Sequence, residues 1–368
     1  MNVNARKVAN VWWKQHFRWL VTVWMLPWYF NSCQYPPKAA TERGFYYWKS
    51  KLELRPTEQT ALTALNVKKL YVKLFDVVAS ADGSGNEPVA RLQTDSNATR
   101  YLQEQQLQII PVVFITNETL LRTDTAHINQ LADNILRLTH QLCAGFQQDT
   151  FSELQLDCDW TQSTKQAYFL LLQKMKAGLK EYPRLQGCTL SATIRLHQVR
   201  YYSRTGIPPA DKGLLMCYNM GNLKNPATNN SILNPDELKS YLVQMEQYPL
   251  PLDVALPLFD WLVLFREGLY KGVISSIKQN QLTSAAGTWT ENRFRFHTDT
   301  TLQLIAFRKG DEVRLEESRK EDLEACIHFL KKRINHSRIT ISFYHLDSNI
   351  ISKHPTYELE TYYRSFAH

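Results

Sequence analysis

Two acidic side chains lie close together in an apolar segment near the middle of the chain. Polar and apolar residues alternate from Glu153 to Thr161, so a strand there places Asp157 and Asp159 on one face. Two neighbouring carboxylates in an apolar strand are costly unless they are ion-paired, protonated or used in chemistry. One of the two should have a raised pKa, and it can hold a proton for general-acid work.

Other strand-like runs also end in polar or aromatic side chains, and we predict that these line the same site. They are Trp48, Asp76, Arg195, His197, Met216, Tyr218, Asn219, Asp260 and Trp261. The rings offer flat faces for a sugar, and the polar groups offer hydrogen bonds. For Arg195, a salt bridge to Asp157 or Asp159 is the plainer interpretation, and it would argue against proton donation by the paired acid.

Eight strand-like runs alternate with helical patterns along the chain. The runs are Phe45–Leu52, Lys69–Val78, Gln108–Thr116, Glu153–Trp160, Thr189–Val199, Gly213–Gly221, Leu252–Phe265 and Arg338–Leu346. Helical spacing of apolar residues recurs at 127–141, 164–179, 235–247 and 320–334. Strands that alternate with helices predict parallel pairing, and eight units predict a closed α/β (β/α)8 TIM barrel. An open doubly wound sheet is the rival, but no glycine-rich phosphate loop supports it.

Residues 266–318 are too many for an ordinary loop, and they contain strand patterns of their own. These patterns cover Arg293–Phe296, Leu302–Phe307 and Glu312–Leu315. We therefore predict a small β-rich insertion between the seventh strand and the helix that follows it. In a barrel of this kind the active site lies at the carboxyl ends of the strands, where the polar residues above fall.

Two short motifs resemble those of glycoside hydrolase family 18, the chitinase-like barrels. Leu156–Trp160 (LDCDW) resembles the fourth-strand D-x-D-W-E signature, and Met216–Asn219 (MCYN) resembles the sixth-strand motif. That family also often carries a small insertion after its seventh strand. The resemblance implies that Asp159 assists a substrate acetamido group, with Asp157 as its partner and Tyr218 and Asn219 as contacts to that group.

The chain departs from this family at the proton donor. The donor Glu falls on Thr161, which cannot protonate a leaving oxygen at neutral pH, and the first Asp of the longer motif falls on Leu154. Glycosidases need two carboxyl groups about 5 to 9.5 Å apart, and Asp76, Asp260 and Asp347 are the candidate replacements. Phe45–Lys51 and the L-x-L-D-x-D strand at Leu154–Asp159 also resemble an uncharacterised family of bacterial barrel domains.

Three hypotheses for the function remain open. The first is an envelope-anchored glycoside hydrolase-like barrel that acts on a polysaccharide or glycoconjugate. The second is a non-catalytic glycan-binding or scaffold lipoprotein with the same fold, which the Thr161 position favours. The third is a purely structural envelope lipoprotein.

The amino terminus has the layout of a secretory signal. Residues 1–18 carry four basic side chains, and the apolar run 19–30 is shorter than the ~20 residues that span a bilayer. Ser32-Cys33 resembles a bacterial lipobox, which implies a lipid on Cys33 and a membrane anchor at the bacterial cell envelope. An uncleaved anchor and an ordinary soluble start are the alternatives. Residues 33–43 are typical of a tether.

The composition excludes several other classes of protein. The 368 residues are 44% hydrophobic and 12% aromatic, which excludes a disordered chain. Without residues 1–32, 39 basic residues face 35 acidic ones, and a net charge of +4 argues against nucleic-acid binding. The cysteines after Cys33 lack metal-ligand spacing, and we predict that they are buried free thiols. One disulfide, formed in an oxidising compartment, is the alternative. We expect no metal and no cofactor, and the sequence leaves the oligomeric state open.

Overall fold

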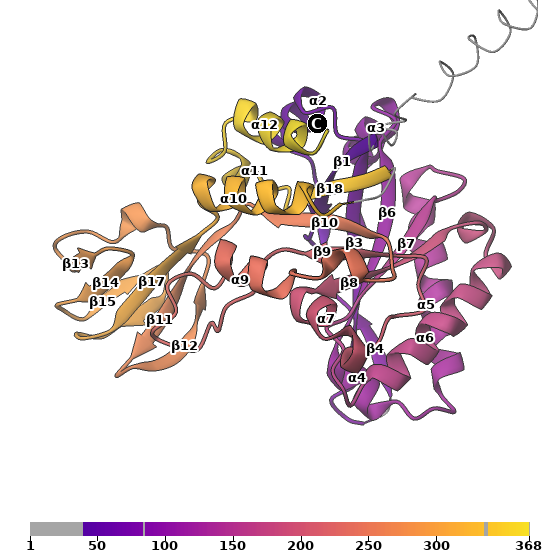
Figure 1. Cartoon of the computed structure of the whole chain (residues 1–368), viewed down its shortest axis with the longest axis horizontal. Coiled ribbons are helices and arrows are strands. Elements are labelled where there is room, and N and C mark those ends of the chain that lie inside the picture. Colours follow the sequence, from indigo (N-terminus) through magenta and orange to yellow (C-terminus); the bar gives the residue numbers. More distant parts are fainter. Residues whose placement is uncertain (1–39, 84, 335–337, 368) are drawn as a thin grey trace, which may run out of the picture. The chain divides into compact units, whose positions relative to one another are not determined.

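The computed structural model describes residues 40–83, 85–334 and 338–367, and within them eight parallel strands form a closed barrel (Figure 1). In chain order these are β1 (Ala40–Tyr47), β3 (Lys69–Ala79), β6 (Gln108–Ile115), β7 (Glu153–Asp157), β8 (Thr189–Arg195), β9 (Lys212–Met216), β10 (Leu252–Pro257) and β18 (Arg338–Tyr344). Each strand pairs with the next, and β1 pairs in parallel with both β3 and β18. The ring is therefore closed, which confirms the (β/α)8 barrel and excludes the open sheet.

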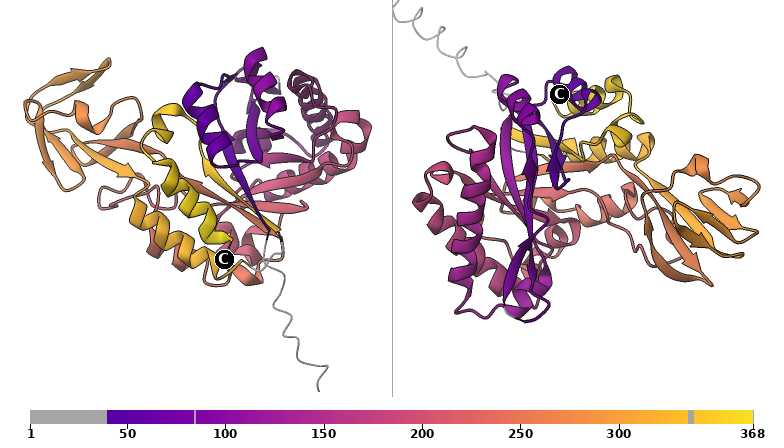
Figure 2. Two further views of the ribbon diagram at one scale, coloured as in Figure 1. Left: turned by 90° about the horizontal axis from the view of Figure 1, so that it is seen from above. Right: turned by 180° about the vertical axis from the view of Figure 1, so that it is seen from behind.

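Helices connect the strands around this ring, and Figure 2 shows them from two further sides. They are α2 (Pro56–Ala64), α3 (Ser96–Glu104), α4 (Asn117–Arg122), α5 (Ile128–Cys143), α6 (Lys165–Gly178), α7 (Leu196–Arg200), α8 (Tyr202–Thr205), α9 (Pro235–Tyr241), α10 (Lys320–Lys331), α11 (Ser348–Ile351) and α12 (Thr356–Phe366). Helices α5 and α6 pack against each other. No helix of the described residues has the length and apolar content to span a membrane.

Several strands begin or end away from the predicted positions. β1 starts at Ala40, so residues 40–43 belong to the barrel and not to a tether. β7 and β8 end at Asp157 and Arg195, earlier than predicted. The prediction extended both strands because the alternation of side chains in the sequence continues into the following turn or helix. The signal segment and Cys33 lie outside the described residues. The cysteines within them are buried free thiols at positions Cys143, Cys158, Cys188, Cys217 and Cys326.

Short additional strands flank the barrel. β4 (Asn86–Val89) pairs antiparallel with the end of β3, and β2 (Lys51–Leu52) pairs with β5 (Gln93–Thr94). The run from Phe45 to Leu52 is thus divided between a barrel strand and this small ladder. Residues 48–50 between the two strands follow β1 and place Trp48 and Lys49 at the carboxyl ends of the barrel strands.

The predicted β-rich insertion is present, but its sheet begins earlier than expected. β11 (Asp260–Arg266) pairs antiparallel with β12 (Leu269–Ile274) and β17 (Glu312–Glu317), and the sheet is completed by β14 (Arg293–Phe296) and β13 (Gly287–Thr290). β15 (Thr300–Leu302) and β16 (Ile305–Phe307) form a hairpin. The insertion has its own apolar core, in which Phe296 stacks on Phe307 with 4.4 Å between the ring centroids.

One predicted strand, Leu252–Phe265, is therefore two strands in different sheets. β10 ends at Pro257 and β11 starts at Asp260. The residues on both sides of this break are buried, but in separate cores. Because apolar residues continue on both sides of the break, one set in each core, the sequence pattern alone does not show where the chain leaves the barrel.

The interior of the barrel is polar over much of its length. The Tyr46 hydroxyl donates to Oε1 of Gln155, whose Nε2 donates to the Ser191 hydroxyl at 3.3 Å. The Ser191 hydroxyl in turn donates to Oε1 of Glu153 at 2.7 Å. These side chains come from three strands, and their hydrogen bonds satisfy polar groups that would be costly to bury alone.

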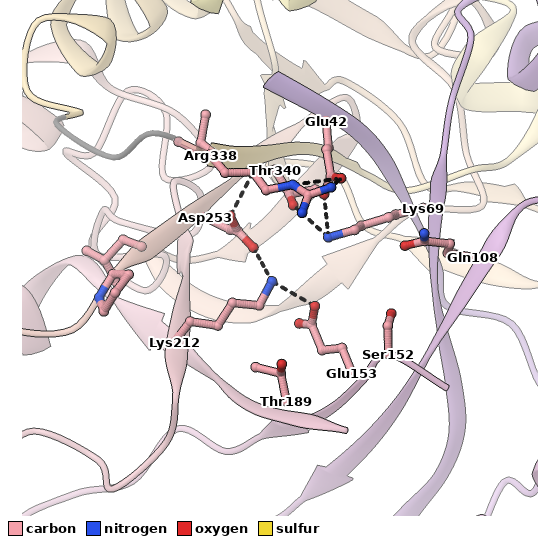
Figure 3. A pocket seen from close by; sticks show the side chains of 13 residues that line it. Glu42, Lys69, Gln108, Ser152, Glu153, Thr189, Lys212, Asp253, Arg338 and Thr340 are labelled. Atoms are coloured by element: carbon pink, nitrogen blue, oxygen red, sulfur yellow. Dashed lines mark hydrogen bonds and ion pairs between the residues drawn. The ribbon is translucent and has the colours of Figure 1, made fainter. Parts of the chain in front are cut away.

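At the amino ends of the strands, buried charges close the barrel. Lys212 Nζ lies 2.7 Å from Glu153 Oε2 and 2.6 Å from Asp253 Oδ2, while Lys69 Nζ lies 2.7 Å from Glu42 Oε2. Figure 3 shows Lys212 between its two carboxylates. We call these five residues the floor of the barrel. They line a cavity of about 340 Å³ in which each carboxylate has a lysine partner.

Candidate functional site

A cavity of about 640 Å³ opens at the carboxyl ends of the barrel strands, and we call it the mouth. Its lining includes nearly all the predicted site residues within the described part of the chain. These are Trp48, Asp76, Asp157, Asp159, Arg195, Met216, Tyr218, Asn219, Asp260 and Trp261. Barrel strands place the polar groups here because each strand ends at this side. The two acids of the LDCDW segment therefore lie in the mouth beside the tyrosine of MCYN.

Asp157 is the last residue of β7, and its side chain points into the barrel. The residue is only 9% exposed, and its Oδ1 accepts a hydrogen bond from the Thr193 hydroxyl at 2.6 Å. Burial and the nearby charge of Asp159 raise the pKa of Asp157 to about 6. Among the described residues, no cation lies within 4.0 Å of this carboxyl group. It is a group that exchanges its proton near physiological pH.

Asp159 is held by a two-pronged ion pair. Arg195 Nε lies 2.6 Å from Oδ1 and Arg195 Nη2 lies 2.6 Å from Oδ2 of this carboxylate. The side-chain amide of Asn117 also donates to the backbone carbonyl of Asp159. The salt bridge confirms the plainer interpretation of Arg195. Arg195 therefore occupies one acceptor position on each oxygen of Asp159 and neutralises its charge, although the side chain is 44% exposed.

The other carboxylates of the mouth are ion-paired as well. The pairs are Asp76 with Lys73 at 2.8 Å, Asp260 with Lys353, and Asp347 with Lys49 at 2.7 Å. Lys278 of the insertion lies a further 4.0 Å from Asp260. The three acids that the sequence suggested as replacements for the missing donor are thus all paired with lysines.

Lys73 is a mouth residue that sequence reasoning missed. It lies three residues before Asp76, and a simple alternation would place the two on opposite faces of β3. A shift in the pairing of β3 with β6 between Lys73 and Phe75 brings both side chains to the inner face. The Lys73 ammonium also lies 5.5 Å from the centre of the Trp48 ring, at cation–π distance.

Thr161, at the position of the resembled family's acid, does not line the mouth. It is exposed and belongs to the turn that precedes α6. Its hydroxyl lies 2.8 Å from the Ser163 hydroxyl, and its backbone N–H donates to the Thr164 hydroxyl at 2.9 Å. The residue therefore organises a turn, and no carboxyl group takes the place of the donor there.

Aromatic rings form a continuous wall of the mouth, with Tyr344 at its centre. The Tyr344 ring lies 5.2 Å from Tyr218, 5.8 Å from Trp48 and 5.8 Å from Phe259, and Phe259 lies 5.1 Å from Trp261. Such a wall presents flat apolar faces beside hydrogen-bonding groups, as carbohydrate sites do.

Sequence reasoning missed Phe114, Phe259 and Tyr344. A signal for Tyr344 was present, because Thr340, Ser342 and Tyr344 alternate along β18 and the first two are buried polar residues. Continuing the alternation places the Tyr344 ring inside the barrel, at its carboxyl end.

Some predicted residues lie elsewhere. His197 is exposed on α7 and does not line the mouth, because β8 ends at Arg195 and the alternation assumed for the strand no longer applies. Partial burial and the Arg195 charge lower the pKa of His197. Trp160 packs on Tyr168 of α6 with 5.3 Å between the ring centroids, on the outer side of the barrel, as expected if Asp159 points inward.

The insertion contributes one side of the mouth through Trp261. The indole N–H of Trp261 donates to Glu316 Oε2 at 2.7 Å, and the Ser231 hydroxyl donates to the same oxygen. Glu316 is fully buried and also pairs with Arg314 at 2.7 Å. Arg314 donates to the backbone carbonyls of Leu223 and Asn225. This cluster fixes the insertion to the loop after β9 and orients the Trp261 ring.

No family model and no curated protein sequence matches the chain, whereas many solved structures share its fold. The spore cortex-lytic enzyme SleL of Bacillus cereus is 16% identical with a TM-score of 0.54, over 89% of this chain and 75% of that one. A chitinase from Chromobacterium violaceum is 12% identical with a TM-score of 0.55, over 89% and 98% of the two chains.

A third similar structure is the C-terminal domain of a putative chitinase from Desulfitobacterium hafniense. It is 10% identical to this chain with a TM-score of 0.55, over 90% of this chain and all of that domain. At these identities the similarity concerns the fold. The chain therefore has the (β/α)8 fold of chitinase-like barrels, as its two motifs predict.

Proposed function

We propose that the protein binds a carbohydrate chain in the mouth and does not hydrolyse it by two-carboxylate chemistry. The observation that carries this proposal is the state of the carboxyl groups. Among the described residues of the mouth, every carboxylate except Asp157 is held by a lysine or arginine. Hydrolysis of this type needs two available carboxyl groups, one as donor and one as nucleophile or base.

The aromatic wall supports the binding part of the proposal. Trp48, Tyr218, Phe259, Trp261 and Tyr344 face a cavity large enough for sugar rings. The structural neighbours named as chitinases and as a spore cortex-lytic enzyme are consistent with a carbohydrate ligand.

A second candidate function is glycoside hydrolysis with Asp157 as the proton donor. The observation that favours it is the raised pKa of about 6, since a general acid needs its proton near the working pH. In this alternative Arg195 must release Asp159, because an available second carboxylate is required.

One experiment separates the two candidates. The purified protein is titrated with a panel of natural and chromogenic glycans, and both binding and released sugar are measured. We expect binding without release, and weaker binding by roughly tenfold for Trp48→Ala, which removes one ring of the wall. Tyr357→Ala is the matched control, because this ring is 70% exposed on α12 and does not line the mouth.

The variant Asp157→Asn completes the design. Turnover by the wild type that disappears in Asp157→Asn would support hydrolysis and contradict the binding-only proposal. If no glycan binds at all, a carbohydrate function is wrong.

We further propose that the protein is a lipoprotein of the bacterial cell envelope, lipidated at Cys33. This proposal rests on the Ser32-Cys33 motif after the apolar run. The test is fractionation of cells that express the wild type or Cys33→Ser. We expect the variant to leave the membrane fraction, because it lacks the acyl chains that anchor it. Membrane association that persists in Cys33→Ser would contradict lipidation.

A further inference from the structure

Among the residues that the structure describes, the mouth has one buried carboxyl group that forms no ion pair. Asp157 lies beside Asp159, and the guanidinium nearest to it, on Arg195, already binds both oxygens of Asp159. On the β3 side, Lys73 is engaged by Asp76. The polar partner of Asp157 is the Thr193 hydroxyl, which is neutral. When Asp157 ionises, its charge is therefore compensated less well than that of any other carboxylate of the mouth.

A ligand can supply the missing charge. A primary ammonium is a compact cation with three N–H donors, so it fits a buried carboxylate beside aromatic rings better than a larger group. The cations already in the mouth repel it little, because each of them is neutralised by its own carboxylate. A charge-assisted hydrogen bond to this buried carboxylate is also stronger than one between neutral groups.

The same arrangement binds an acetamido group less favourably than an ammonium group. The resembled family's pattern makes Asp159 the carboxylate that receives such a group, yet both oxygens of Asp159 accept bonds from Arg195. An acetamide is neutral, so it does not compensate Asp157 either. Of the two common forms of a hexosamine, the free amine matches the charges of this mouth.

We propose that the mouth selects a sugar with a free amino group, whose ammonium pairs with Asp157. This inference rests on the carbohydrate-binding function proposed above and names the class of sugar. It concerns binding alone, and no bond is made or broken.

The test is calorimetric titration of the purified protein, near neutral pH, with two oligosaccharides of equal length. One is an oligomer of glucosamine and the other is the same oligomer of N-acetylglucosamine. We expect the glucosamine oligomer to bind at least roughly tenfold more tightly. Asp157→Asn should abolish this preference, because the amide keeps the shape and removes the charge.

Asp236→Asn is the matched control, since that carboxylate is 92% exposed, pairs with Lys239 and does not line the mouth. The preference for glucosamine should persist in this variant. A preference that survives in Asp157→Asn, or that is lost equally in Asp236→Asn, would overturn the inference. The comparison of the two oligomers on the wild type remains informative even if a variant does not fold.

The outcomes also separate this inference from the function on which it rests. If neither oligomer nor any other glycan binds, the proposed function itself fails. If the acetylated oligomer binds as tightly as the amine or more tightly, only the selection of an amino sugar fails. A lysine-containing peptide that binds as tightly as the glucosamine oligomer would show that the mouth recognises amines without a sugar.

Discussion

The floor and the mouth of the barrel both contain buried charges, but they compensate them differently. At the floor, Lys212 forms ion pairs with Glu153 and Asp253, and Lys69 forms one with Glu42. At the mouth, Asp157 forms no ion pair within the described part of the chain, and Arg195 is bound to Asp159. Each carboxylate of the floor has a lysine partner, whereas Asp157 has no ion pair among the described residues. The difference supports our proposal that the floor stabilises the barrel and that the mouth binds a ligand.

The strongest test of this comparison is the removal of a cation from the floor. Lys212→Met leaves Glu153 and Asp253 buried together without a counter-charge, and we expect a loss of about 3–5 kcal/mol in the free energy of unfolding. Urea unfolding near pH 7 measures it. Lys278→Met is the control: this rim side chain is 36% exposed and lies 4.0 Å from Asp260, so we expect a cost below about 1 kcal/mol. Equal costs would contradict the structural role of the floor.

The next largest effect is expected at Asp157 and depends on pH. Burial first, and then the charge of Asp159, raise the pKa of Asp157 from 3.8 to about 6 in the folded protein. The folded state therefore binds this proton more tightly than the unfolded state, and its stability falls as the pH rises from about 4 to above 6. The full penalty is about 3 kcal/mol.

Asp157→Asn should remove this penalty. We expect the variant to resemble the wild type near pH 4 and to exceed its stability by up to about 3 kcal/mol above pH 6. Unfolding free energies measured across this range show the difference. Asp347→Asn should instead lower the stability near pH 7. Burial alone would raise the pKa of Asp347, but the hydrogen bond to Lys49 and the Lys49 charge outweigh burial and lower this pKa. A pH-independent effect of Asp157→Asn would refute the buried, uncompensated charge.

The smallest effect is expected at the edge of the floor. Arg338 also pairs with Glu42, but its side chain is 73% exposed and Glu42 keeps Lys69. Arg338→Ala should cost less than about 1 kcal/mol, and added salt should reduce the difference further. Thermal or urea unfolding at two salt concentrations measures it. A cost comparable to that of Lys212→Met would mean that burial does not decide which pairs matter.

The parts of the fold and site that could be predicted depend on local periodicity. The alternation around Asp157 and Asp159 identified both acids and the outward position of Trp160, because side chains of a strand alternate whatever surrounds it. The eightfold recurrence of strand and helix predicted closure of the barrel. These inferences need only the residues within one element.

The parts that failed depend on breaks in that periodicity or on distant partners. The Gln198 side chain accepts from the backbone N–H of Arg195 and helps to start α7, which moves His197 out of the strand pattern. The bulge after Lys73 and the break after Pro257 leave no clear mark in the sequence. Lys49 and Lys353 reach the carboxylates of the mouth from other elements, and a local pattern does not contain such pairings.

The first residues of β11 belong to two structures at once. Asp260 and Trp261 line the mouth, and they also begin the antiparallel sheet of the insertion, where Glu316 of β17 holds the Trp261 indole. The insertion is therefore not a detachable module. Exchanging it for that of another barrel would replace part of the cavity wall together with the group that orients it, so changes in this sheet can alter ligand choice while all eight barrel strands stay the same.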